Sequence, residues 1–299
     1  MTRYLTRVVA AAASAAFALG LAACSTGVAA STSPSSSPAA SESTSASATP
    51  TAVDVKTLTV TPGKLTIATG KPAYSPWVED DKPESGKGFE AAVAYAVAEK
   101  LGFAKEDVVW KRTTFDEAIA PGPKAWDFNL QQYSITDERK KAVDFSSSYY
   151  TTSQAVLTYA GSPAEKATSI ADLKSVKFGV AIGTTSQKAL TTIIAPTSQP
   201  KIFNSNDDLV QALKSKQIEA LVVDLPTALY LAAAEIDNGK IVGQLADTSG
   251  GDQFGLVLAK GSKLTEPVTA AVDALKADGT LAALEKQWLS DSIKVPVLQ

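Results

Sequence analysis

From about Thr57 onward, short apolar runs alternate with segments of helical periodicity, and this alternation restricts the chain to an α/β fold. The run "KLTIATG" at 64–70 predicts a strand. In "GKGFEAAVAYAVAEKLG" at 86–102, apolar residues recur at the spacing of an amphipathic helix, with Gly102 as its stop signal. A second series begins with the strand "KFGVAIG" at 177–183. Further strands are predicted at "DVVW", "DFNLQQYSI", "QAVLTYA", "KIFN", "IEALVVD" and "FGLVLAKG".

The two series predict two α/β lobes with a cleft between them. Ligands of open α/β sheets bind beyond the carboxyl ends of the strands. The strand-to-helix turns that face the cleft are therefore the candidate site.

Composition removes several classes of function. Histidine is absent and Cys24 is the only cysteine, so Ser-His-Asp and Cys-His catalysis and zinc sites built from His or Cys are excluded. Only carboxylate, lysine, tyrosine or oxygen-ligand metal chemistry is left, and we expect no cofactor and no metal. The 28 Lys and Arg residues against 31 Asp and Glu provide no electrostatic footprint for nucleic acid.

The N-terminus predicts export. "MTRYLTR" is a basic n-region, and residues 8–23 form an apolar h-region too short for a comfortable membrane span. The quartet "LAAC" ending at Cys24 resembles the bacterial lipobox, which implies cleavage after residue 23 and a diacylglycerol on the Cys24 thiol. The alternative is an ordinary signal peptide cut elsewhere, with Cys24 incidental. Two acyl chains would anchor the protein stably outside the membrane.

Residues 24–56 predict a linker, because from Ser25 to about Val53 the sequence is almost entirely Ser, Thr, Ala and Pro. Such a flexible segment would average roughly 30 Å end to end and reach about 95 Å when fully extended. It would let the folded part stand off a membrane.

The stretch "QQYSITDERKKAVDF" at 131–145 has an arginine where helix electrostatics disfavours a cation. Thr136 is a good N-cap, so Asp137 and Glu138 are first-turn residues and Arg139 is the third helical residue, at the positive end of the macrodipole. Two interpretations are open. Arg139 pairs with a surface carboxylate and contributes little, or it faces an external anion together with the helix N-terminus.

From about Leu65 to Trp288 the order of motifs resembles the bacterial extracellular solute-binding proteins of family 3, the amino-acid receptors of ABC importers. The motifs that carry the resemblance are "YSPW", "GFEAAVA", "TTFDEAI", "SITDERKKAVDFSSSYY", "GTTS", "EALVVDLPTA", "FGLVLAKGS" and "ALKADGTLAALEKQW". The resemblance implies a two-lobed periplasmic-binding-protein-like fold of type II, with a ligand cleft between the lobes and two hinge strands.

We expect lobe 1 to comprise 57–152 and 254–299, and lobe 2 to comprise 153–253. The strands near 151–155 and 252–255 would form the hinge. Lobe 1 is thus built from both ends of the folded chain.

The resemblance also implies roles for polar residues. Arg139 would bind the α-carboxylate of an amino acid, and Thr185 in the "GTTS" turn, next to the hydroxyl of Thr184, would contact it from the other lobe. Asp224 would bind the α-ammonium. The hydroxyl of Ser134 and the backbone at Gln132 would complete the ammonium site.

Structural alternatives remain for these residues. The threonines of "GTTS" are ordinary N-cap residues, and Asp224 could cap the helix that begins at Pro226. Glu90 sits where relatives usually have Asp, and we interpret it as structural. Lys71 could meet an acidic ligand side chain or be a solvated loop lysine.

Three aromatic residues match positions that line the ligand's side chain in relatives: Tyr74, Trp77 and Phe115. Aromatic residues are usually core, and Trp77 could instead pack behind the other two. The amide groups of "QQY" suggest a polar ligand. Because relatives often have glycine where this chain has Gln132, side-chain selectivity cannot be copied from them.

The sequence thus predicts a monomeric, lipid-anchored extracytoplasmic receptor that delivers an amino acid to an ABC permease and its ATPase. Two alternatives stay open. One is an enzyme of the cyclohexadienyl dehydratase type on the same fold, which would need a general acid or base in the cleft. The other is a ligand sensor that docks on a membrane kinase.

Overall fold

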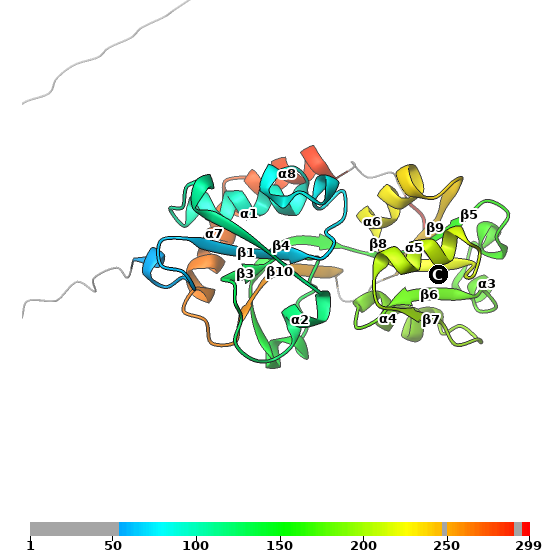
Figure 1. Cartoon of the computed structure of the whole chain (residues 1–299). Helices are drawn as coiled ribbons and strands as arrows, with labels where there is room; N and C mark the ends of the chain where they lie inside the picture. The colour runs from blue at the N-terminus through cyan, green and yellow to red at the C-terminus, as the bar shows by residue number, and fades with distance from the viewer. Residues whose placement is uncertain (1–53, 247–249, 290–294) are drawn as a thin grey trace, which may run out of the picture. The chain divides into compact units, whose positions relative to one another are not determined.

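Two β-sheets, each with its own helices, organise the part of the chain that the structure describes (Figure 1). The computed structural model describes residues 54–246, 250–289 and 295–299, all within one compact unit, Ala52–Gln299. The predicted signal peptide, Cys24 and the linker up to residue 53 lie outside these ranges. Within them, no helix is both long and apolar enough to cross a membrane.

The elements follow the predicted alternation. The strands are β1 (Leu65–Gly70), β2 (Val108–Thr113), β3 (Phe128–Asn129), β4 (Val143–Thr152), β5 (Gln154–Tyr159), β6 (Phe178–Ala181), β7 (Lys201–Phe203), β8 (Ala220–Asp224), β9 (Gly239–Leu245), β10 (Asp252–Ala259) and β11 (Val297–Leu298). The α-helices are α1 (Phe89–Lys100), α2 (Phe115–Ile119), α3 (Ile170–Leu173), α4 (Thr185–Ala189), α5 (Asn206–Lys214), α6 (Leu225–Tyr230), α7 (Thr265–Ala277) and α8 (Thr280–Trp288).

The first sheet has the order β2-β1-β3-β10-β4 and forms lobe 1. β1 is parallel to β2 and β3, whereas β10 is antiparallel to β3 and β4. Leu65 and Ile67 of β1 pack into a cluster with α1, α7 and α8, while Ala68 packs with Trp126 and Tyr133 in another cluster. Figure 1 shows α1 and α8 on one side of this sheet and α2 on the other. With helices on both faces of the sheet, β1 is buried along its whole length, Thr66 and Thr69 included.

The second sheet has the order β11-β9-β5-β8-β6-β7 and forms lobe 2. Alternate residues of β8 enter different clusters: Ala220 and Val222 pack on one face, and Leu221 and Val223 pack on the other with α5. The sheet is therefore covered on both faces. Its parallel strands β6, β7 and β8 direct their carboxyl ends toward the same edge.

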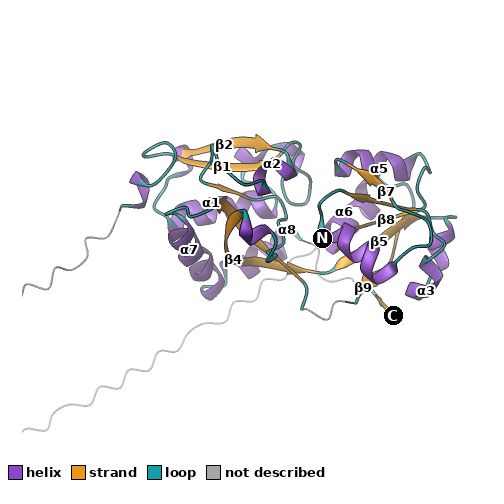
Figure 2. Cartoon of the chain, turned by 90° about the horizontal axis from the view of Figure 1, so that it is seen from below, coloured by secondary structure: helices purple, strands orange, loops and turns teal. Residues whose placement is uncertain are grey.

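The lobes are connected where strands change sheet. β4 ends at Thr152 in the first sheet, and β5 begins at Gln154 in the second; Figure 2 shows β4 leading from one group of elements to the other. β10 begins at Asp252, whose register partner in β4 is Thr152. The end of β4 and the start of β10 thus lie side by side.

The structure differs from the predicted lobes at both ends of the folded chain. We assigned 254–299 to lobe 1, but β11 pairs in parallel with β9 of lobe 2, and Leu298 is buried in the core of that lobe. We extended the linker to residue 56, but Val55 already packs against the core of lobe 1. The strand β9 was also not predicted. The two-residue strand β11 and the single anchoring side chain of Val55 carry no periodic signal, so the sequence pattern could not reveal them; the seven-residue strand β9 was simply missed.

Candidate ligand-binding site

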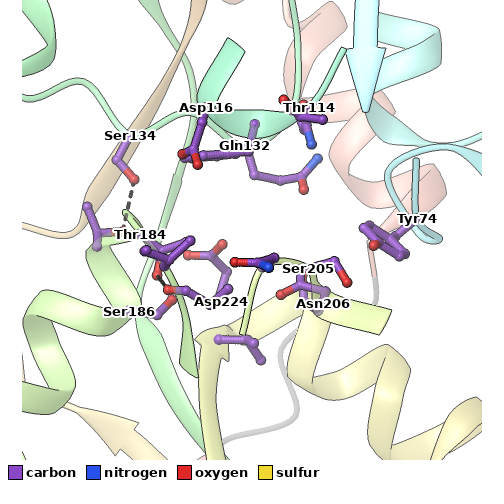
Figure 3. Close-up of a pocket in the computed structure, with 18 of the residues that line it drawn as sticks. Tyr74, Thr114, Asp116, Gln132, Ser134, Thr184, Ser186, Ser205, Asn206 and Asp224 are labelled. Carbon is purple, nitrogen blue, oxygen red and sulfur yellow. Dashed lines mark hydrogen bonds between the residues drawn. The ribbon is translucent and has the colours of Figure 1, made fainter. Parts of the chain in front are cut away.

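A cavity of about 310 Å³ is lined by strand-to-helix turns from both lobes. Lobe 1 contributes the segments that follow β1, β2 and β3, and lobe 2 contributes those that follow β6, β7 and β8. In Figure 3, Asp116 and Ser134 of lobe 1 face Thr184, Asp224 and Asn206 of lobe 2. This is the edge at which α/β sheets bind ligands.

The cavity brings together eight of the nine residues that we predicted to contact a ligand. They are Tyr74, Phe115, Gln132, Ser134, Arg139, Thr184, Thr185 and Asp224. The ninth, Trp77, does not line it.

Arg139 is held at the base of the cavity by both lobes. Its side chain donates from Nη1 to the Ser134 carbonyl (2.8 Å) and from Nη2 to the Gly183 carbonyl (3.0 Å), and its guanidinium lies 5.2 Å from the Phe115 ring centroid. The residue is only 9% exposed, and this burial lowers the pKa of Arg139 from its ordinary value. Arginine nevertheless stays charged, so the site holds a buried cation that neutral carbonyl groups orient without neutralising.

The surface-pair interpretation of Arg139 is wrong. Among the described residues no carboxylate forms an ion pair with Arg139, and Lys140 instead lies 3.6 Å from Asp137. The predicted cap is formed, because Thr136 Oγ1 accepts from the Arg139 backbone N–H (3.1 Å). The helix we expected after it is only the turn Arg139–Lys141, so its macrodipole adds little and any anion here would be held by the guanidinium.

The two threonines of the "GTTS" turn divide the roles that we left open. Thr184 is the N-cap of α4: its Oγ1 accepts from the Gln187 backbone N–H (3.1 Å) and donates to the Ala181 carbonyl (2.8 Å). Thr185 does not cap. Its Oγ1 lies 3.2 Å from the hydroxyl of Ser134 in lobe 1, so this pair spans the cleft.

Asp224 ends β8 and occupies the N-cap position of α6, yet its side chain makes no capping hydrogen bond. Its Oδ1 accepts from Gln154 Nε2 (2.7 Å) instead. Burial and the neighbouring carboxylate of Asp252 raise the pKa of Asp224 to about 7, against the opposing effects of the Gln154 bond and Arg139. Because it does not cap the helix, Asp224 is available to a cation in the cavity. Pro226 is the second helical residue rather than the first.

The aromatic residues separate into two groups. Tyr74 and Phe115 line the cavity, and burial together with Asp207 raises the pKa of Tyr74 to about 12, so its hydroxyl stays protonated. Trp77 is 1% exposed and packs edge-on against Phe89 and Phe254, which corrects our inclusion of it among ligand contacts. The indole is too large and apolar to leave the core of lobe 1.

Trp77 has a different role, because its Nε1 donates to Thr227 Oγ1 of lobe 2 (2.9 Å). Trp77→Phe should keep the packing but remove this bond between lobes, at a cost of about 0.5–1.5 kcal/mol. We expect ligand affinity to fall by roughly two- to tenfold, mainly through faster dissociation, as measured by stopped-flow fluorescence. Trp110→Phe is the matched control, since the indole of Trp110 bonds Tyr95 within lobe 1 (3.0 Å). Equal dissociation rates in the two variants would contradict this role.

Gln132 and Glu90 form a unit beneath the cavity. Gln132 has a left-handed φ of 51°, a conformation that favours glycine. Glu90 compensates, because it accepts from the Gln132 backbone N–H (2.7 Å) and side-chain Nε2 (2.5 Å) and from the Tyr149 hydroxyl. Burial raises the pKa of Glu90 to about 7. The Gln132 N–H is thus committed to Glu90, but an ammonium would need the Gln132 carbonyl, so the backbone role of Gln132 stays a prediction.

Sequence reasoning missed several polar residues of this region. Asp116 lines the cavity from lobe 1 and Asn206 from lobe 2, whereas Gln131, which also lines it, was considered only as an amide of "QQY". Asp116 lies in "TFDEA", between Thr114 and Glu117, whose spacing is that of a helix capping box. Asp116 was therefore interpreted as part of a helix start and not as a ligand contact. Gln154 and Asp252 were noticed only as part of the hinge. The described residues contain no group of three Asp, Glu, His or Cys side chains that could hold a metal ion.

The fold and the cavity define a two-lobed solute-binding protein, in which residues from both lobes line a ligand site between them. The model of the bacterial extracellular solute-binding proteins, family 3, matches residues 65–291. The chain belongs to this family.

Named relatives agree with this assignment. The chain is 30% identical to a probable histidine-binding protein of Campylobacter jejuni, with 75% of this chain and 85% of the relative covered. It is also 30% identical to the L-arginine-binding protein of Pseudomonas aeruginosa, with 75% and 90% covered. Among solved structures, an ancestral arginine-binding protein bound to glutamine matches with a TM-score of 0.65 and 32% identity, covering 77% of this chain and all of that one.

Proposed function

We propose that this protein binds a single free amino acid between its lobes and delivers it to an ABC permease. The observation that carries the proposal is that Arg139 from lobe 1 and Asp224 from lobe 2 line the same cavity, together with the hydroxyl-bearing residues Ser134 and Thr185. A guanidinium suits an α-carboxylate and a carboxylate suits an α-ammonium, so a zwitterion would be recognised at both ends. A volume of about 310 Å³ is at the small end of ligand sites and fits one amino acid.

The ligand's side chain would be polar. The rest of the cavity wall carries Lys71, Asp116, Gln131 and Asn206, while Tyr74 and Phe115 supply aromatic surface. Amide and charged groups of both signs favour a side chain with several hydrogen-bonding atoms. The relatives named for arginine and histidine, and the ancestral protein bound to glutamine, bind ligands of this kind.

A binding role is favoured over an enzyme of the dehydratase type. Such an enzyme would need a general acid or base that reaches the ligand. Glu90 has a suitable pKa, but its carboxylate is 1% exposed and occupied by Gln132 and Tyr149. Asp224 and Arg139 line the same cavity and carry the opposite charges that would bind the two ends of a zwitterion. Such binding requires no covalent step.

The lipobox at Cys24 and the linker that follows it support a location on the outer face of the cell membrane. There a monomeric receptor could move between free ligand and a permease bound to its ATPase. Because the ligand must be released, we expect a dissociation constant near micromolar, about −8 kcal/mol.

The test is titration calorimetry of a form that begins at Ser25, unfolded and refolded to remove any co-purified ligand. The ligands are the standard amino acids and prephenate. Saturable binding of one or a few polar amino acids is the expected result. Consumption of prephenate without amino-acid binding would overturn the proposal in favour of the enzyme.

A further inference from the structure

Gln154 occupies the point at which the chain crosses between lobes. It is the first residue of β5, two positions after the end of β4, and it is 7% exposed. Gln154 does not line the main cavity; it lines an adjoining groove that also includes Thr185 and Asp252. Nothing so far has assigned it a role.

One nitrogen of Gln154 bonds two carboxylates that belong to different parts of the fold. Nε2 donates to Asp224 Oδ1 (2.7 Å), in lobe 2, and to Asp252 Oδ2 (2.6 Å), at the start of β10 in the sheet of lobe 1. It also lies 3.5 Å from Thr185 Oγ1. The amide therefore contacts Asp224, which would bind the ligand's ammonium group, and Asp252 near the hinge. It also lies close to Thr185, which would bind the ligand's carboxylate.

Charge fixes the orientation of this amide. The two carboxylates repel each other, and the two N–H groups of Nε2 place positive charge between them. The other amide atom, Oε1, is buried without a hydrogen-bond partner among the described residues. A flipped amide would direct that oxygen at two anions. The repulsion would cost more free energy than leaving Oε1 without a hydrogen-bond partner, so the observed orientation is favoured.

We propose that Gln154 is a positioning residue that holds the Asp224 carboxylate for the ligand's ammonium group and ties it to Asp252, coupling ammonium recognition to lobe closure. This inference rests on the proposed function. With the amide in place, Asp224 keeps one orientation in the closed lobes, and an arriving ammonium completes the neutralisation of two adjacent anions. Without it, the carboxylates would separate and closure would lose one of its links.

Gln154→Leu tests the proposal, because leucine fills similar space without donors. The probes are L-arginine with 5-guanidinopentanoate and L-glutamine with glutaramate, where the second member of each pair lacks only the α-ammonium. We expect the affinity of Gln154→Leu for whichever amino acid binds to fall by about 10- to 100-fold, and for its partner to fall less than about threefold. Equal losses for both members, or no loss, would overturn the proposal.

Gln244→Leu is the matched control. Gln244 lies in the same sheet, bonds Ser153 and the Val295 carbonyl, and contacts neither Asp224 nor Asp252 among the described residues. Its affinities should equal those of the wild type. In an Asp252→Asn background, where one anion is removed, Gln154→Leu should cost at least about fivefold less, since the two residues act together. If Gln154→Leu lowers the affinity by the same factor with and without Asp252→Asn, Gln154 does not act by bridging Asp224 and Asp252.

A second measurement does not depend on the ligand. The form that begins at Ser25 has no cysteine, so Lys111→Cys in lobe 1 and Lys201→Cys in lobe 2 can carry two spin labels. Pulsed electron resonance should show longer interlobe distances in Gln154→Leu than in Gln244→Leu. If the wild type binds no amino acid, the proposed function fails. The role of Gln154 in holding the lobes together would be rejected separately, by identical interlobe distance distributions in Gln154→Leu and Gln244→Leu.

Discussion

Arg139→Ala should abolish measurable amino-acid binding while leaving the fold intact. The guanidinium is buried, has only neutral partners among the described residues, and is the cation available to a carboxylate at the base of the cavity. Removing one member of a buried charge pair costs about 2–5 kcal/mol, or roughly 30- to 4,000-fold in affinity. The Gly183 carbonyl of lobe 2 would also lose its donor, so the true effect should lie toward the upper end.

Titration calorimetry measures this loss, and far-ultraviolet circular dichroism checks the fold. Lys141→Ala is the matched control, because Lys141 is an exposed cation in the same turn. Arg139→Lys should recover only part of the affinity, since an ammonium cannot form two parallel bonds to a carboxylate. Unchanged binding by Arg139→Ala would remove the zwitterion model altogether.

Asp224→Asn should weaken amino-acid binding by about 100-fold and remove its pH dependence below neutrality. In the ligand-free protein the pKa of Asp224 is about 7, raised by burial, by Asp252 and by Glu90, and opposed by Gln154 and Arg139. An ammonium ligand needs the ionised carboxylate. Wild-type affinity should therefore be constant above about pH 8 and fall by up to roughly tenfold per unit as the pH drops below 7, with a proton released on binding.

The sign for the folding stability of the ligand-free protein is opposite. A carboxyl group whose pKa is raised on folding favours the folded form when protonated, so its contribution is greatest at low pH and is lost as pH rises toward 7. Glu90, also at about 7, contributes in the same direction. Calorimetry in buffers of different ionisation enthalpy separates the effect of Asp224 from that of Glu90, because only Asp224→Asn should remove the proton release on ligand binding. Asp273→Asn, on the exposed face of α7, should behave as wild type.

Local signals were sufficient wherever one short segment supplies all the partners. The capping box between Thr114 and Glu117 is present, with bonds of 2.8 and 3.3 Å, and the cap of Ser205 on the Asp208 N–H measures 3.1 Å. The apolar run of β8 correctly predicted a strand, and the structure buries both of its faces. The unusual position of Arg139 raised the question of its role but left two interpretations open, and its burial in the structure excludes the surface pair.

Residues that look alike in sequence required the fold to distinguish them. Thr184 and Thr185 are adjacent and chemically identical, yet one caps α4 and the other faces Ser134 across the cleft. Trp77 and Phe115 are both aromatic, but only Phe115 reaches the cavity. Composition and periodicity do not distinguish the members of either pair. Which residue reaches the cavity depends on how the two lobes are placed around it.

By itself, the sequence determined most of the order of strands and helices, the presence of two lobes, the turns that form the site and the charges that those turns carry. These follow from spacings of a few residues, over which caps and amphipathic faces act. Only the tertiary structure decided that Gln154 bridges Asp224 and Asp252, which are 70 and 98 positions away, and that the C-terminal strand returns to lobe 2. Such contacts depend on the packing of whole sheets, and no local pattern records them.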